Sequence, residues 1–215
     1  MEYIDKAQII KKRLEVAHDA DEACVRRGFF EAENAFFKKH INGQKVLVAG
    51  SGLGHDVFEI AEYNKKVVGV EILDLLVGVA KNNALQRRLD NVTFVHGDFM
   101  RADYSDKHFD SAVLNMGTIG NFDDKAKVLL ALLRISKKVF FDFYPPCLDG
   151  LQMRKKMYEE EKWENVRVDG TKVVSDDGLD SVSLSVAEVE GIVKSIGAKV
   201  KFYDLNYFSV MAVVE

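Results

Sequence analysis

The 215-residue sequence contains few of the residues that cross-link or stiffen a small protein: two cysteines and two prolines. Cys24 and Cys147 are far apart and form no CxxC pair. This pattern excludes a disulfide-rich secreted scaffold, and it predicts a reducing, cytoplasmic environment. A chain of this length buries roughly 70% of its unfolded surface, so its core needs neither a disulfide nor a metal. We therefore expect no metal site.

Long hydrophobic runs are also missing. The longest apolar stretches, such as residues 128–133, are far shorter than the roughly 20 residues of a membrane span. The first segment, MEYIDKAQIIKKRLE, carries acidic residues from its start and lacks the apolar region of a signal peptide. These absences predict a soluble, intracellular protein without a membrane partner.

An excess of positive charge is missing as well. The chain has 30 Lys and Arg against 34 Asp and Glu, which gives a net charge of −4. The short basic clusters at 11–13, 87–88 and 155–156 are scattered along the chain. Proteins that bind nucleic acid usually carry a larger basic surface. The charge pattern therefore disfavours a nucleic-acid partner and favours a small-molecule ligand, while it gives no indication of the oligomeric state.

Apolar runs of strand length alternate with segments of helical spacing through the middle of the chain. The expected strands are 45–49, 66–70, 91–96, 109–114 and 138–143, and helices are expected between them. Continuous apolar strands separated by helices are typical of a doubly wound parallel sheet. Two closing strands, 199–205 and 207–214, have a tight connection and must be antiparallel. We predict an α/β fold with a mostly parallel seven-stranded sheet, an antiparallel C-terminal strand and helices on both faces.

Two segments lie outside this alternation. Residues 1–40 have helical spacing with an expected break at Gly28, and we expect them to form an N-terminal helical cap. Residues 41–215 would form the main domain. Within it, residues 150–183 are expected to be an insertion made of a charged helix followed by a hairpin at 165–174.

The strongest functional signal is the glycine-rich turn after the first expected strand, in the sequence VLVAGSGLGHD at 46–56. Glycines in such a turn let the chain reverse sharply and let a ligand approach the backbone. The dinucleotide pattern G-x-G-x-x-G requires a small residue at position 55, which is His55. The actual spacing, G-x-G-x-G, ends at Gly54. It disfavours a nicotinamide dinucleotide and favours a nucleoside ligand.

Two acids at expected strand ends support this interpretation. Glu71 follows Gly50 by about 20 positions, the spacing at which a ribose-binding acid occurs. An ionised carboxylate can accept hydrogen bonds from both ribose hydroxyls. Asp98 ends the third strand, where it can accept from the amine of an adenine, and Phe99 offers a backbone N–H and an apolar face.

The motifs VLVAGSGLG, VVGVE, VTFVHGDF and FDSAVLNMGTIGNF, in this order, resemble those of class I S-adenosylmethionine-dependent methyltransferases. The resemblance covers residues 44–144, and the closing helix and two strands extend it to the C-terminus. It implies that the chain binds S-adenosyl-L-methionine and releases S-adenosyl-L-homocysteine. These motifs are fairly specific for the fold and the cofactor and poorly specific for the methyl acceptor.

The resemblance also implies roles for individual residues. The implied cofactor-binding residues are Gly50, Ser51, Gly52 and Gly54 on the methionine part, Glu71 on the ribose, Ile72, Asp98 and Phe99 around the adenine, and Asn115, Met116 and Gly117 near the sulfonium. The family often has an acid two positions before the first glycine, where this chain has Val48. A backbone carbonyl near Ala49 or Asn115 can instead hold the cofactor's amino group. The Asn-Pro-Pro-Tyr motif of amide and base methylation is absent after the fourth strand.

These features predict methyl transfer to a small-molecule acceptor by in-line displacement. Positioning the nucleophile supplies most of the rate, and a base is needed only if the nucleophile arrives protonated. The candidate catalytic residues are Asn115 and Tyr144, with Asp142 and, less strongly, His18 as further candidates. Arg27 can grip the cofactor carboxylate. Aromatic residues of the two extra segments, such as Tyr158 and Trp163, can wall an acceptor pocket.

Three alternatives stay open. The chain can be a methyltransferase that acts on a protein. It can be a non-catalytic subunit with the methyltransferase fold, an idea that Val48 and the lack of an evident base favour. A nucleotide-dependent oxidoreductase is disfavoured by His55.

Overall fold

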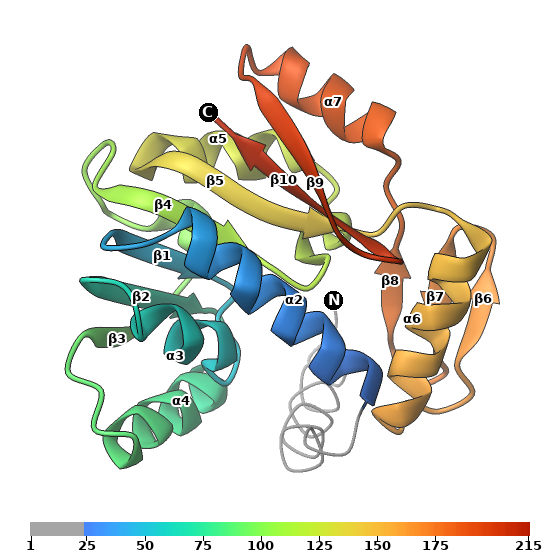
Figure 1. Ribbon diagram of the computed structural model, residues 1–215, viewed down its shortest axis with the longest axis horizontal. Helices are drawn as coiled ribbons and strands as arrows, with labels where there is room; N and C mark the ends of the chain where they lie inside the picture. The colour runs from blue at the N-terminus through green and yellow to red at the C-terminus, as the bar shows by residue number, and fades with distance from the viewer. Residues whose placement is uncertain (1–23) are drawn as a thin grey trace.

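A seven-stranded sheet forms the centre of the computed structural model, which describes residues 24–215 (Figure 1). Its strand order is β3-β2-β1-β4-β5-β10-β9. The strands are β1 (Lys45–Ala49), β2 (Lys66–Glu71), β3 (Val92–His96), β4 (Phe109–Leu114), β5 (Ser136–Phe143), β9 (Val200–Asn206) and β10 (Ser209–Val214). The first five run parallel, and β10 runs antiparallel to both β5 and β9. The predicted fold class is confirmed.

Helices cover both faces of this sheet, because alternate strand residues point to opposite sides. On one face lie α2 (Cys24–His40), α3 (His55–Ala61) and α4 (Asp74–Gln86), packed over strand residues such as Val46 and Val48. On the other face lie α5 (Lys125–Ile135), α7 (Val186–Ser195) and the short helix η1 (Phe99–Arg101), packed over residues such as Leu47. Two hydrophobic layers therefore enclose the sheet, and its ligand edge lies at the carboxyl ends of β1 to β5.

The expected helix break at Gly28 is wrong, because α2 runs without interruption from Cys24 to His40. Gly28 is exposed on this helix, where the glycine costs roughly 0.5–1 kcal/mol relative to alanine. Phe29 and Phe37 are buried against the rest of the protein, and this packing outweighs the local cost. The earlier segment, including the candidate His18, lies outside the described residues.

A smaller unit follows β5. It consists of α6 (Leu148–Glu160) and a three-stranded antiparallel sheet of β6 (Arg167–Asp169), β7 (Lys172–Val174) and β8 (Asp180–Val182). Strand β8, three residues long like β6 and β7, was not predicted, because residues 175–179 rather than a two-residue turn separate it from β7. The unit lies beside one end of the main sheet (Figure 1). A hydrogen bond of 2.9 Å from Leu184 N to Tyr144 O joins the two ends of this segment.

A buried arginine holds the smaller unit together. Arg154 of α6 donates from Nη1 to Ser181 O (3.1 Å) and Ser181 Oγ (2.9 Å), and from Nη2 to Ser183 Oγ (2.5 Å). Its guanidinium carbon lies 4.8 Å from the centroid of the Tyr144 ring. The hydrogen bonds attach α6 to the β8 segment. The cation–π contact with Tyr144 attaches α6 to the end of β5.

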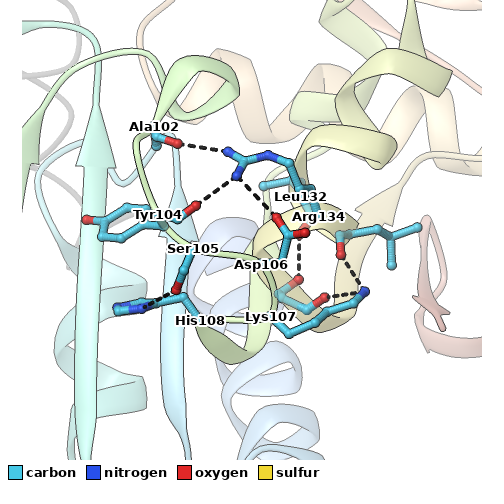
Figure 2. A network of polar contacts seen from close by, with 10 residues as sticks. Ala102, Tyr104, Ser105, Asp106, Lys107, His108, Leu132 and Arg134 are labelled. Atoms are coloured by element: carbon cyan, nitrogen blue, oxygen red, sulfur yellow. Dashed lines mark hydrogen bonds and ion pairs between the residues drawn. The ribbon is translucent and has the colours of Figure 1, made fainter.

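A polar network fixes the edge of the sheet opposite the ligand edge (Figure 2). Arg134, at the end of α5, donates to Tyr104 O (2.7 Å) and Ala102 O (2.9 Å). Lys107 donates from Nζ to Leu133 O, and its backbone N–H donates to Arg134 O (2.8 Å). The Lys107 bonds satisfy carbonyls at the end of α5, which have no intrahelical partner. The Arg134 bonds position the loop that leads into β4.

Candidate active site

The glycine-rich turn between β1 and α3 has the geometry of a ligand cradle. Gly50, Gly52 and Gly54 have φ angles of 67°, 53° and 94°, which side chains other than glycine rarely adopt. A Cβ on Gly54 would lie 2.7 Å from the rings of Phe58 and Phe94, so this glycine allows α3 to pack closely. No atom lies within 4 Å of a Cβ built on Gly50 or Gly52. The turn therefore faces open space at its first two glycines.

Glu71 at the end of β2 is coupled directly to this turn. Its Oε2 accepts from Gly52 N at 2.9 Å, and its Oε1 accepts from Leu73 N at 3.0 Å. The residue is buried, and each oxygen retains a lone pair after these bonds. The next side chain, Ile72, is 58% exposed and so offers an apolar surface at the same edge.

Asp98 and Phe99 follow β3, the strand beside β2. Gly97 N donates to Glu71 O at 2.9 Å, so the ends of these two strands lie together. Asp98 caps the short helix η1 by accepting from Met100 N at 2.9 Å. The Phe99 ring is buried in the core on the α5 face and makes an edge contact with Phe122. The structure therefore brings Asp98 to the expected edge and turns the Phe99 ring into the core.

A cavity of about 230 Å³ opens beside the turn. We call it the larger cavity; it is lined by Arg26, Phe30, Gly50, Ser51, Gly52, Leu53, His55, Asp56, Phe58, Leu76, Asn83, Arg87 and Met116. Four of these were predicted from the motifs: Gly50, Ser51, Gly52 and Met116. The α4 residues were missed, although their spacing of seven and four positions places Leu76, Asn83 and Arg87 on one helix face.

The loop after β4 adopts an unusual backbone conformation. Met116 and Gly117 both have φ angles of 62°, which is strained for a methionine. Gly117 N donates to Asp142 Oδ1 at 2.8 Å, and this bond holds the loop in place. A Cβ on Gly117 would lie 2.3 Å from the Tyr144 ring. Asn115, the residue before Met116, donates from Nδ2 to Asp56 Oδ2 at 3.3 Å.

A second cavity, of about 60 Å³, lies between this loop and the smaller unit. We call it the smaller cavity; it is lined by Arg26, Met116, Gly117, Thr118, Asn121, Tyr158, Glu161, Trp163, Leu179, Asp180 and Ser181. Arg26 and Met116 line both cavities, so the two adjoin at these side chains. Arg26 Nε lies 2.6 Å from Glu161 Oε1, and Trp163 Nε1 donates to Glu161 Oε2 at 3.0 Å.

Three buried ionisable side chains near the strand ends have shifted pKa values. Burial raises the pKa of Asp142 to about 7, and the nearby Asp56 adds to the increase. Burial also raises the pKa of Glu33 on α2 well above its ordinary value, with contributions from Asp142 and Asp56. The phenol pKa of Tyr144 is likewise raised by burial. These groups therefore favour their neutral forms more strongly than they would in water.

Residues 40–169, more than half of the chain, match the sequence pattern of the methyltransferase-domain family. The chain belongs to this family. The motifs that resemble class I S-adenosylmethionine-dependent methyltransferases lie almost entirely within the matched region. Of these motifs, the glycine-rich turn and Met116 line the larger cavity of the methyltransferase, whereas Glu71 and Asp98 lie outside its wall.

Two curated proteins are similar to parts of this methyltransferase. The 23S rRNA (uracil(1939)-C(5))-methyltransferase of Shewanella frigidimarina is 34% identical over 86 residues, which cover 38% of this chain and 19% of that protein. The sterol 24-C-methyltransferase of Gibberella zeae is 34% identical over 101 residues, covering 46% of this chain and 26% of that protein. The chain therefore spans about a fifth to a quarter of the length of these relatives.

Solved structures resemble the methyltransferase over nearly its whole length. The PH0226 protein of Pyrococcus horikoshii superposes with a TM-score of 0.70 and 22% identity, over 88% of this chain and 90% of that one. The magnesium protoporphyrin IX methyltransferase of Synechocystis, solved with bound S-adenosylhomocysteine, has a TM-score of 0.63 and 17% identity, over 93% and 86%. At these identities the likeness establishes the fold.

The residues predicted to be catalytic are less accessible than expected. Tyr144 is buried among Phe29 and Phe208 and lines neither cavity. Asn115 is also buried. Arg27 is exposed, whereas its neighbour Arg26 lines both cavities.

Residues 24–215 lack two further kinds of feature. No group of three or more His, Cys, Asp or Glu side chains there is arranged to hold a metal ion. No helix in the same residues is long and apolar enough to cross a membrane.

Proposed function

We propose that this methyltransferase binds S-adenosylmethionine in the larger cavity, binds a small-molecule acceptor in the smaller cavity, and transfers a methyl group between them. The observation that carries this proposal is that the two cavities adjoin at Arg26 and Met116. A donor and an acceptor bound on either side of these residues would be held close together. Proximity and orientation of this kind account for much of the rate of group transfer.

The residues around the larger cavity suit the cofactor. A ligand can lie against the backbone at Gly50 and Gly52, where the structure is open. The Ser51 hydroxyl is buried without a hydrogen-bond partner, and Glu71 retains a lone pair on each oxygen for the two ribose hydroxyls. We assign the adenine contacts to Ile72, which is largely exposed, and to Asp98 after β3. When bound, the cofactor supplies a methyl group on a positively charged sulfur, which is electrophilic without further activation.

We assign positioning roles to the two residues first considered as catalytic. Tyr144 packs on Gly117, and Asp142 holds the Gly117 N–H, so together they fix the backbone beside Met116. Because burial raises the phenol pKa of Tyr144, this group stays protonated at neutral pH and does not act as a base. Asn115 does not ionise, and it orients Asp56 toward the larger cavity through its side-chain amide.

The size and walls of the smaller cavity favour a small acceptor. Its apolar wall is formed by Met116, Tyr158 and Leu179, and its polar side by the paired charges of Arg26 and Glu161. A protein or nucleic acid would have to present a single protruding group to reach it. We therefore assign acceptor selection to α2 and to the smaller unit after β5.

The function is tested by ligand-dependent melting followed by a transfer assay. S-adenosylhomocysteine is expected to raise the melting temperature by mass action, whereas NAD is not. The protein is then incubated with methyl-labelled S-adenosylmethionine and, separately, with small thiols, amines, phenols and carboxylic acids, with ribosomal RNA and with a protein extract. Label in a small molecule supports the proposal. Label confined to RNA or protein contradicts the acceptor class, and the absence of any melting shift contradicts the cofactor assignment.

Replacement of Glu71 by alanine is expected to weaken S-adenosylhomocysteine binding roughly 100-fold or more. The variant loses two charge-assisted ribose contacts and also the bond that positions Gly52, and hydrogen bonds to a charged group contribute about 1.5–3 kcal/mol each. Isothermal titration calorimetry measures this loss. Asp74→Ala, which removes a nearby exposed acid, is the control. Equal affinities of the wild type and Glu71→Ala would disprove the ribose assignment.

A further inference from the structure

Several buried oxygen acceptors near the larger cavity have no hydrogen-bond donor. Glu33 of α2 is 2% exposed, and neither of its carboxyl oxygens accepts a well-formed hydrogen bond. Asp142 Oδ2 at the end of β5 and Asn115 Oδ1 after β4 are also buried and unpartnered. A buried acceptor without a donor costs free energy, and native proteins rarely leave several together. A ligand that presents N–H donors would satisfy these acceptors.

Glu33 lines a very small cavity with room for one group. Its volume is about 10 Å³, close to the space that one water-sized group needs. Phe30, His55 and Asp56 line both this small cavity and the larger cavity. The smaller cavity, assigned to the acceptor, has none of these described residues in its wall. A group that reaches Glu33 therefore comes from the cofactor side.

The barrier between the larger cavity and Glu33 is a pair of stacked rings. The ring centroids of Phe30 and His55 are 3.8 Å apart, and the two rings are inclined by 21°. The His55 side chain is about half exposed to solvent, so its ring can rotate outward without disturbing the core. Such a rotation would connect the two cavities on the side of Asp56.

The charges around Glu33 favour a cation that carries several N–H donors. Burial, Asp142 and Asp56 raise the pKa of Glu33, and Arg26 and the Asn115 amide oppose this increase. The local charge is thus acidic whenever these groups ionise. An alkylammonium group has three N–H donors and a positive charge, so it satisfies both the orphaned acceptors and the charge.

We propose that Glu33, together with Asp142 and Asn115, binds the α-ammonium group of the cofactor's methionine part. The inference rests on the cofactor site proposed above and concerns a part of it that the motifs do not explain. Val48 provides no polar side chain for this group, and the acid that serves it comes instead from α2, outside the glycine-rich motif.

The test compares two ligands that differ only in the ammonium group. S-adenosylhomocysteine and its deaminated analogue, in which hydrogen replaces the α-amino group, are titrated calorimetrically into the wild type, Glu33→Gln and Glu31→Gln. Glu31 is an exposed acid on the same helix, so its variant makes the same replacement of a carboxyl by an amide. We expect Glu33→Gln to weaken S-adenosylhomocysteine binding roughly 10- to 100-fold and to leave the analogue's affinity unchanged. Glu31→Gln should match the wild type for both ligands.

Three results would overturn the inference. The first is equal weakening of both ligands by Glu33→Gln, which would indicate a general distortion of the site. The second is unchanged S-adenosylhomocysteine binding by Glu33→Gln with a raised KM for an amine acceptor, which would assign the subsite to the acceptor. The third is equal affinity of the wild type for the two ligands, a measurement that depends on no variant. If the wild type binds neither ligand, the proposed function itself fails, so the two failures are distinguishable.

Discussion

Glu161→Gln is expected to lower the free energy of unfolding by about 3–5 kcal/mol. Arg26 is buried, and its guanidinium lies 2.6 Å from the Glu161 carboxylate, whose side chain is 3% exposed. Removing one charge of a buried pair leaves the other without compensation, and this costs far more than the net contribution of the intact pair. A glutamine can still accept from Trp163 Nε1, so the change isolates the lost charge.

Urea unfolding at pH 7 measures the effect of this substitution. Glu159→Gln is the matched control: Glu159 pairs with Lys155 at the surface of the same helix, and loss of an exposed pair changes stability by about 1 kcal/mol or less. The double variant Arg26→Met with Glu161→Leu should recover much of the loss, because no buried charge remains. A loss below about 1 kcal/mol for Glu161→Gln would show that the pair is well solvated.

Asp142→Asn is expected to make the protein progressively more stable than the wild type as the pH rises from about 4 to 7. The folded pKa of Asp142 is about 7, because burial and, to a smaller extent, Asp56 disfavour its charge, against an ordinary value of 3.8. Below pH 3.8 the Asp142 carboxyl is protonated in both the folded and the unfolded state, so its burial does not yet lower the free energy of unfolding. Between these values the unfolded state releases the proton and the folded state keeps it, so stability falls as the pH rises.

The gap between the two pKa values corresponds to about 4 kcal/mol, which Asp142→Asn should remove. The asparagine keeps an oxygen for the Gly117 N–H, while its new NH₂ group adds an offset that does not vary with pH. The measured quantity is therefore the change in the stability difference between pH 4 and pH 8, from urea unfolding of both proteins. Asp142 also raises the pKa of Glu33, so Asp142→Asn lowers that pKa and adds to the stability difference in the same direction. Parallel stability curves would contradict the prediction.

The sequence predicted the sheet well because each strand carries its own signal. After their first lysine, the runs KVLVA and KVVGV are apolar, as strands buried on both faces must be, and the helix between them requires a right-handed parallel crossover. Glu71 was found for a similar reason, since its position relative to the glycine-rich turn is fixed by one helix and one strand. Local patterns decide these features.

Other features depend on distant contacts, which a sequence pattern does not contain. The continuity of α2 through Gly28 results from its packing on α6 of the smaller unit and on β9 and α3 of the main fold. The pairing of Arg26 with Glu161 joins residues more than 130 positions apart. Glu33 did leave a trace: it lies four residues after Phe29 and four before Phe37, in the apolar stripe of its helix. A carboxylate at that spacing is unusual enough to be noticed from the sequence.

The bond between Leu184 N and Tyr144 O has a consequence for how the protein can change over evolution. Because the chain leaves and rejoins the main fold at one point, the segment 145–183 can be exchanged for another that also supplies a partner for Arg26. Its replacement by a segment of different length or chemistry would change the wall of the smaller cavity while the glycine-rich turn kept its geometry. Related chains can therefore diverge in the molecules they modify through a single local replacement, and a laboratory graft at residues 144 and 184 is the natural way to redirect this scaffold.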